Sequence, residues 1–183
     1  MRLCGALREK LATIMTPFEP FRVYWRVYGG WKALLSSIYF WLSAAITLAC
    51  YPLWSEVSST DGGRPVTDTL LTIVPALMAF TLAGMAIILA LSGSRFIKAI
   101  REDGRDDSLF MRVVAFFFHF ILVQSLALLA ALVSASYPSV DWLAGGAFFL
   151  AAYGVASAVA IAAMLLNVSR VYNVTGGEDD DTA

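Results

Sequence analysis

The feature that most constrains this chain is the absence of charge from four long apolar stretches. No Asp, Glu, Lys or Arg occurs in Ala33–Trp54, Thr69–Leu91, Val113–Ser136 or Leu143–Asn167. A helix of about 20 apolar residues crosses the ~30 Å hydrocarbon core of a bilayer, and each stretch is long enough to do so. The sequence therefore predicts an all-α integral membrane protein whose transmembrane helices form a four-helix bundle.

The remaining residues of the 183-residue chain are too few to build a separate soluble domain. We therefore expect a single domain over 1–183 with three parts. These are an N-terminal amphipathic, interfacial cytoplasmic segment over 1–30, the transmembrane bundle over 31–167 and a cytoplasmic acidic tail over 168–183.

Basic residues are strongly segregated among the connecting segments. Six precede the first predicted span, five lie between the second and third, and one follows the fourth. Arg64 is alone between the first and second spans, and the third connection has none. By the positive-inside rule, both termini and the middle loop are expected on the cytoplasmic side of a cell inner (plasma) membrane.

Aromatic and basic residues alternate ahead of the first span. Phe21, Tyr24, Trp25 and Tyr28 recur at helical spacing. Trp and Tyr favour the headgroup region, and Arg favours anionic lipid. We expect residues 1–28 to form two short helices on the inner leaflet; the alternative is a docking element for a protein partner. The expected lipid-interface residues are Arg22, Trp25, Arg26, Trp31 and Lys32.

Two spans carry small residues at a spacing of three and four, which allows helices to approach closely in lipid. In span two these are Ala76, Ala79, Ala83, Ala86, Ala90 and Gly93. In span four the series includes Ala147, Ala151, Gly154 and Ala158. We expect these seams to pack the chain's own bundle, and the alternative is a contact between protomers of a homo-oligomer.

Span three contains the candidate polar intramembrane residues His119, Gln124 and Ser125. His119 and Gln124 lie ~140° apart on a helix, so they are not expected to form one site. Gln124 is expected to bond to another helix, with Ser36, Ser43 and Thr47 as candidate partners. For both residues a structural role is the first interpretation, and pore lining or pH sensing is the alternative.

The spans lack the residues that most membrane enzymes and ion-coupled transporters need. They hold no carboxylate for proton coupling, one histidine instead of several, and no His-Glu ligand set. No glycine-rich phosphate loop occurs either. We therefore expect no enzyme, no cofactor, no metal site and no nucleic-acid partner.

These observations predict a non-enzymatic accessory or regulatory membrane protein that acts through its spans or its cytoplasmic surface. Roles in exclusion, immunity, defence or transporter support fit that class. Its expected partners are the lipid bilayer, another copy of the chain, and a cytoplasmic or membrane protein. The alternative is an oligomeric channel or membrane-permeabilising effector, in which His119, Gln124 and the seams shape a pore.

Overall fold

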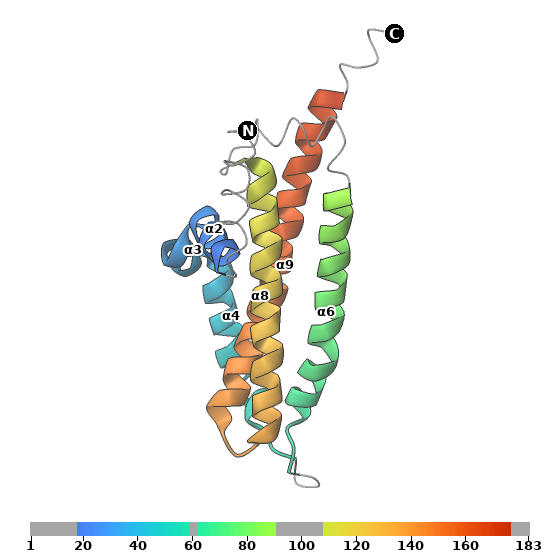
Figure 1. Cartoon of the computed structure of the whole chain (residues 1–183). Helices are drawn as coiled ribbons and strands as arrows, with labels where there is room; N and C mark the ends of the chain where they lie inside the picture. The colour runs from blue at the N-terminus through green and yellow to red at the C-terminus, as the bar shows by residue number, and fades with distance from the viewer. Residues whose placement is uncertain (1–17, 59–61, 91–107, 177–183) are drawn as a thin grey trace, which may run out of the picture.

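The computed structural model describes residues 18–58, 62–90 and 108–176, and every element within these ranges is a helix (Figure 1). The three long helices are α6 (Pro65–Ala90), α8 (Leu109–Ser136) and α9 (Asp141–Gly176). Each includes a stretch long and apolar enough to cross a membrane: Pro65–Ile87, Leu109–Ser136 and Asp141–Asn167. The prediction of an all-α membrane bundle is confirmed.

The first predicted span is a broken helix. It consists of α3 (Gly30–Ser36) and α4 (Ile38–Ala49), bent by 54° at Ser37, and the short helix α5 (Tyr51–Ser55) follows. The bent pair supplies a fourth span if its two helices are counted together. The charge-free stretch 33–54 is thus not one continuous helix, because Ser37 adopts an extended conformation (φ −71°, ψ 124°).

Side chains satisfy the carbonyl groups that this break leaves without helical partners. The Ser36 hydroxyl donates to the Ala33 carbonyl at 3.2 Å, and the Trp41 indole donates to the Leu35 carbonyl at 2.8 Å. A backbone carbonyl without a hydrogen bond in lipid would destabilise the fold by several kcal/mol, which is roughly the cost of burying any unpaired polar group. The sequence at the break thus supports the interruption locally.

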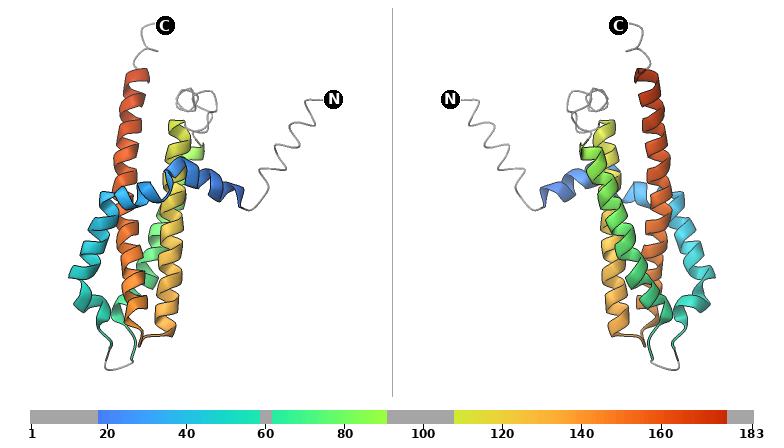
Figure 2. Two further views of the ribbon diagram at one scale, coloured as in Figure 1. Left: turned by 90° about the vertical axis from the view of Figure 1, so that its left-hand side faces the viewer. Right: turned by 90° about the vertical axis from the view of Figure 1, so that its right-hand side faces the viewer.

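The helix α2 (Glu19–Tyr28) precedes the broken span and lies across the long helices together with α3 (Figure 2). Pro20 lies in its first turn, where a missing amide hydrogen costs nothing. Gly29 ends it at φ 97°, a left-handed conformation that glycine adopts without a steric penalty. This turn redirects the chain from α2 into α3.

The core forms where large side chains of α6 meet small side chains of α8 and α9. Leu70 and Val74 are buried against Ala127, Ala131 and Ala147, all three of which are fully buried. Small residues on α8 and α9 let those helices approach closely, and the larger α6 side chains fill the remaining space. The central helix α8 therefore contacts both other long helices.

The two small-residue seams have different surroundings in the structure. On α9, Ala147 and Gly154 are buried and Ala151 and Ala158 are partly buried in the bundle. On α6 the seam instead faces outward, which differs from the expectation of packing within the chain. The exposed members are Ala76, Ala79, Ala83 and Ala86.

Several expected features lie outside the described residues. These are the first short helix before residue 18, the middle loop over 91–107, the side chain of Ala90, the seam position Gly93, and the end of the acidic tail over 177–183. The first residues of the expected tail are helical, because α9 continues to Gly176.

Candidate functional site

A buried cluster of one histidine and three tyrosines joins α2, α8 and α9. His119 Nδ1 lies 2.6 Å from the Tyr24 hydroxyl, and Nε2 lies 2.9 Å from the Tyr153 hydroxyl and 3.2 Å from that of Tyr28. The Tyr28 and Tyr153 hydroxyls are themselves 3.2 Å apart. The four side chains therefore form one connected polar network in a largely apolar bundle.

Helical spacing brings these side chains together. Tyr24 and Tyr28 are four residues apart, so both point from one face of α2 towards α8. The Tyr28 ring stacks on the His119 ring with centroids 4.2 Å apart and planes inclined by 19°. The Phe118 and Tyr24 rings have centroids 5.1 Å apart and planes inclined by 57°. Aromatic packing therefore fixes the ring positions that the hydrogen bonds require.

The number of hydrogens in the cluster favours one arrangement of hydrogen-bond donors and acceptors. Burial raises the pKa of Tyr24 to about 12, so its phenol keeps its proton near neutral pH. Nδ1 is the hydrogen-bond partner that the described residues give to the buried Tyr24 hydroxyl, so donation to Nδ1 satisfies the phenol hydrogen. We therefore assign Tyr24 as the donor, which places the imidazole hydrogen on Nε2, pointing to Tyr153. The Tyr28–Tyr153 pair shares one hydrogen bond but owns two hydroxyl hydrogens. One hydroxyl hydrogen of this pair is therefore left for another acceptor.

The sequence pattern identified His119 but not its partners. Tyr24 and Tyr28 were expected on a lipid-facing stripe with Trp25; instead Tyr24 is buried and Tyr28 is partly buried against α8. The available signal was a pair of tyrosines at i and i+4 in a chain with one histidine. Tyr153 carried no local signal of this kind.

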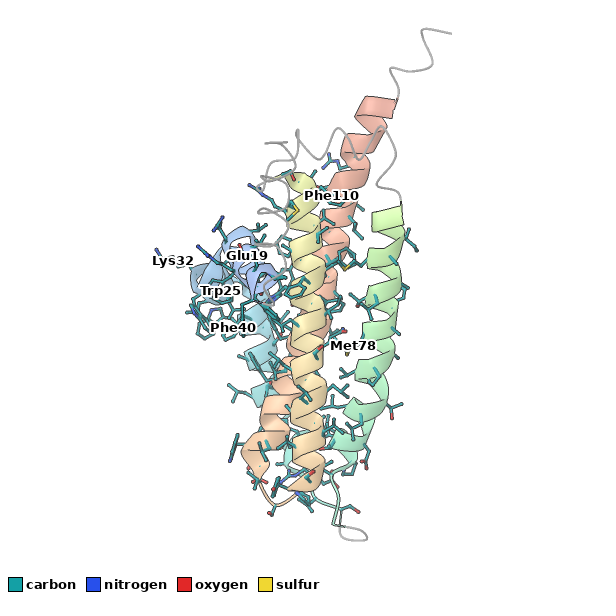
Figure 3. The ribbon with its side chains drawn as sticks, in the orientation of Figure 1. Glu19, Trp25, Lys32, Phe40, Met78 and Phe110 are labelled. Carbon is teal, nitrogen blue, oxygen red and sulfur yellow. The ribbon has the colours of Figure 1, made fainter. Side chains whose placement is uncertain are left out.

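The expected lipid-interface residues form a continuous exposed surface on α2 and α3, here called the basic–aromatic surface. Its members are Arg22, Trp25, Arg26, Trp31 and Lys32, and all five are exposed. The Trp25 and Trp31 rings meet edge to face at 5.1 Å. Lys32 points away from the bundle (Figure 3). Thus α2 docks on the bundle through its tyrosines, while α2 and α3 present cations and indoles outward.

Gln124 lies apart from the His119 cluster, as its helical angle predicts. Its side chain is 1% exposed, and its amide nitrogen and oxygen have no hydrogen-bond partner among the described residues. The expected bond to span one is absent there, because the candidate hydroxyls bond within their own helix; Ser43 donates to Tyr39 and Thr47 to Ser43. Ser125 likewise donates to the Ile121 carbonyl at 2.8 Å.

A cavity of about 560 Å³ opens beside the cluster. Its walls come from α2, α3, α4, α8 and α9 and from the Ser37 break. His119, Tyr28 and Tyr153 line its inner side, and Arg112 and Asn167 line it further along α8 and α9. Its volume lies within the range of small-molecule sites, which is roughly 300–1,000 Å³.

At the other end of the bundle, Arg64 joins three segments. Its guanidinium donates to the Pro138 carbonyl and the Trp54 carbonyl, each at 2.7 Å, and forms an ion pair with Asp141. Arg64 is 2% exposed, whereas the Asp141 side chain is mostly exposed. The sequence pattern showed only that Arg64 is the single basic residue between the first two predicted spans, and it did not predict these contacts.

Within the described part of the chain, no group of three His, Cys, Asp or Glu side chains could hold a metal ion. Comparisons with protein-family models, with curated proteins and with solved structures gave no match. The fold therefore defines the class on its own evidence: this is a small, all-helical, multi-pass membrane protein.

Proposed function

We propose that this protein is a non-enzymatic accessory or regulatory membrane protein that binds a protein partner through its basic–aromatic surface. The observation that carries the proposal is the docking of α2. Hydrogen bonds that join Tyr24 and Tyr28 to His119 hold α2 on the bundle, while Arg22, Trp25 and Arg26 remain exposed. Polar groups buried in an apolar bundle are costly unless they are bonded, so this connection favours a helix with one fixed position.

The charge distribution supports a cytoplasmic position for this surface. Arg22, Arg26 and Lys32 lie on α2 and α3, and Arg112 and Arg170 lie near the start of α8 and near the end of α9, which are at the same end of the bundle (Figure 1). At the other end, Arg64 is buried and paired with Asp141, so it adds no free positive charge. Both termini are therefore proposed to face the cytoplasm of an inner membrane.

Site-specific photo-cross-linking in native membranes tests the partner surface. A benzophenone amino acid replaces Trp31, which is 67% exposed, or Trp142, which is 74% exposed at the opposite end. We expect one discrete protein adduct from position 31 and none from position 142, because only the former lies on the basic–aromatic surface. The adduct should weaken in an Arg22→Glu, Arg26→Glu double variant. Equal adducts from both positions, or lipid adducts alone, would contradict the proposal.

The channel alternative requires self-association, and the exposed seam on α6 is a surface that copies of the chain could share. Against it, Gln124 is enclosed within a single chain and faces no lumen there. Planar-bilayer recordings of the purified full chain separate the two functions. We expect silent membranes; reproducible unitary conductance would favour the channel.

A further inference from the structure

The cavity beside His119 is distinct from the basic–aromatic surface and has its own chemistry. Arg112 is the only charged side chain that lines it, and no ion pair joins Arg112 to a carboxylate within the described residues. A cation that has no ion-pair partner among the described residues, at the end of the bundle where other basic residues gather, is complementary to an anion.

The walls between the polar groups are apolar. Phe116 separates Arg112 from His119 on α8, and Ile161 and Met164 face the cavity from α9. Arg112 and His119 are seven residues apart, which corresponds to about 10 Å along the helix axis. The occupant must therefore combine an anionic group with apolar surface.

The inner side of the cavity offers a hydrogen-bond donor. The Tyr28–Tyr153 pair retains one hydroxyl hydrogen after the cluster's own bonds are made, and both tyrosines line the cavity. The Ser37 break also lines it, and non-helical backbone at membrane depth is tolerated where it borders a polar cavity or is buried in protein. A second acceptor on the same ligand would satisfy this donor.

We infer that the cavity binds an anionic phospholipid. Arg112 holds the phosphate, a tyrosine hydroxyl of the Tyr28–Tyr153 pair donates to an ester carbonyl oxygen, and the acyl chains lie against Phe116, Ile161 and Met164. A free fatty acid has one acidic group and no ester, so it meets only one of the two polar contacts. This inference stands independently of the proposed protein partner.

Native mass spectrometry of the purified full chain tests the site with phosphatidylglycerol and with phosphatidylcholine of the same acyl chains. We expect phosphatidylglycerol to bind at least about fivefold more tightly, because one basic residue favours a lipid of net negative charge and the choline cation cancels the phosphate charge of phosphatidylcholine. Arg112→Gln should remove this preference. Arg170→Gln should retain it, because Arg170 is an exposed cation on α9 that does not line the cavity.

A matched pair on α9 tests the location. Ala162 and Ala163 are adjacent and both exposed, but only Ala163 lines this cavity. Ala163→Phe should weaken phosphatidylglycerol binding at least fivefold, and Ala162→Phe should not; circular dichroism and gel filtration verify that each variant folds. Equal binding of the two phospholipids, equal effects within either variant pair, or oleate binding as tight as phosphatidylglycerol would overturn the inference.

Discussion

Two adjacent glycines of α9 have opposite environments. A Cβ atom built on Gly145 would lie 3.1 Å from two atoms of the Trp54 ring, whereas one on Gly146 would meet nothing within 4 Å. The Trp54 ring cannot easily yield, because it is buried and its indole donates to the Thr47 carbonyl at 2.7 Å. Gly145 therefore allows α5 to pack against the start of α9.

This difference predicts opposite effects of the same substitution. Gly145→Ala should lower the free energy of unfolding by about 1–3 kcal/mol, because it overfills a tight contact with a fixed aromatic ring. Gly146→Ala should leave it unchanged or raise it by up to ~1 kcal/mol, through better helix propensity. Thermal unfolding in detergent measures both. Equal destabilisation by the two alanines would show that Trp54 does not set the constraint.

Burial of the Gln124 amide has a free-energy cost that no hydrogen bond among the described residues offsets. Both of its amide atoms are buried without a hydrogen-bond partner there. An unsatisfied buried polar group costs about 1–3 kcal/mol, and replacing it by an apolar group of similar shape removes that cost. A residue of this kind is unfavourable for stability in a single chain.

We predict that Gln124→Leu raises the unfolding free energy by about 1 kcal/mol, and that Gln124→Glu lowers it because a carboxylate would be buried without a partner. The neighbouring Ser125→Ala is the control, since Ser125 already bonds to its own helix and should change little. Equilibrium unfolding in mixed micelles measures all three. A loss of more than 1 kcal/mol in the leucine variant would reveal a hydrogen bond to Gln124.

At the scale of elements, the side chain of Arg64 connects the ends of several helices. Arg64 bonds to the end of α5, to the turn between α8 and α9, and to Asp141 at the start of α9. The three contacts use three different guanidinium nitrogens, and a lysine has only one nitrogen from which to reach acceptors placed this far apart. These contacts hold the end of α5, the end of α8 and the start of α9 close to the start of α6, which directly follows Arg64.

Arg64→Lys is accordingly predicted to lower the unfolding free energy by about 3 kcal/mol, because buried carbonyls lose charge-assisted hydrogen bonds. Asp141→Asn should cost less than ~1 kcal/mol, since the carboxylate is largely exposed and solvent screens its ion pair. Differential scanning fluorimetry ranks the two. If the asparagine variant is the less stable one, the ion pair outweighs the carbonyl contacts.

For the whole molecule, orientation in the membrane follows from free positive charge. Basic residues that lack an ion pair in the described residues gather at the α2–α3 side, whereas Arg64 at the other end is neutralised by Asp141. This arrangement strengthens the difference between the two ends beyond what a count of residues shows.

Cysteine labelling in intact cells measures this orientation. In a Cys4→Ser, Cys50→Ser background, an impermeant reagent should label cysteines placed at Gly62 or Ser139, which are both exposed. It should not label cysteines at Gly104 or Gly177 until the cells are opened. External labelling at Gly104 would reverse the proposed topology.

Sequence alone determined the membrane class and the position of the spans, because a charge-free stretch of sufficient length is a local property of the chain. It also placed Arg22, Trp25 and Arg26 on faces of α2 that remain exposed, since helical periodicity fixes relative angles within one element. The break at Ser37 was the exception, because neither proline nor glycine lies beside it to mark an interruption of the helix.

Only the tertiary structure decided which faces meet. The hydroxyls that contact His119 belong to residues 95, 91 and 34 positions away in the chain, and no periodicity relates such distant positions. The α6 seam faces outward because larger residues, Leu70 and Val74, fill the space beside the small residues of α8 and α9. Helical pattern sets the faces of each element, but packing complementarity between elements chooses the face that is buried.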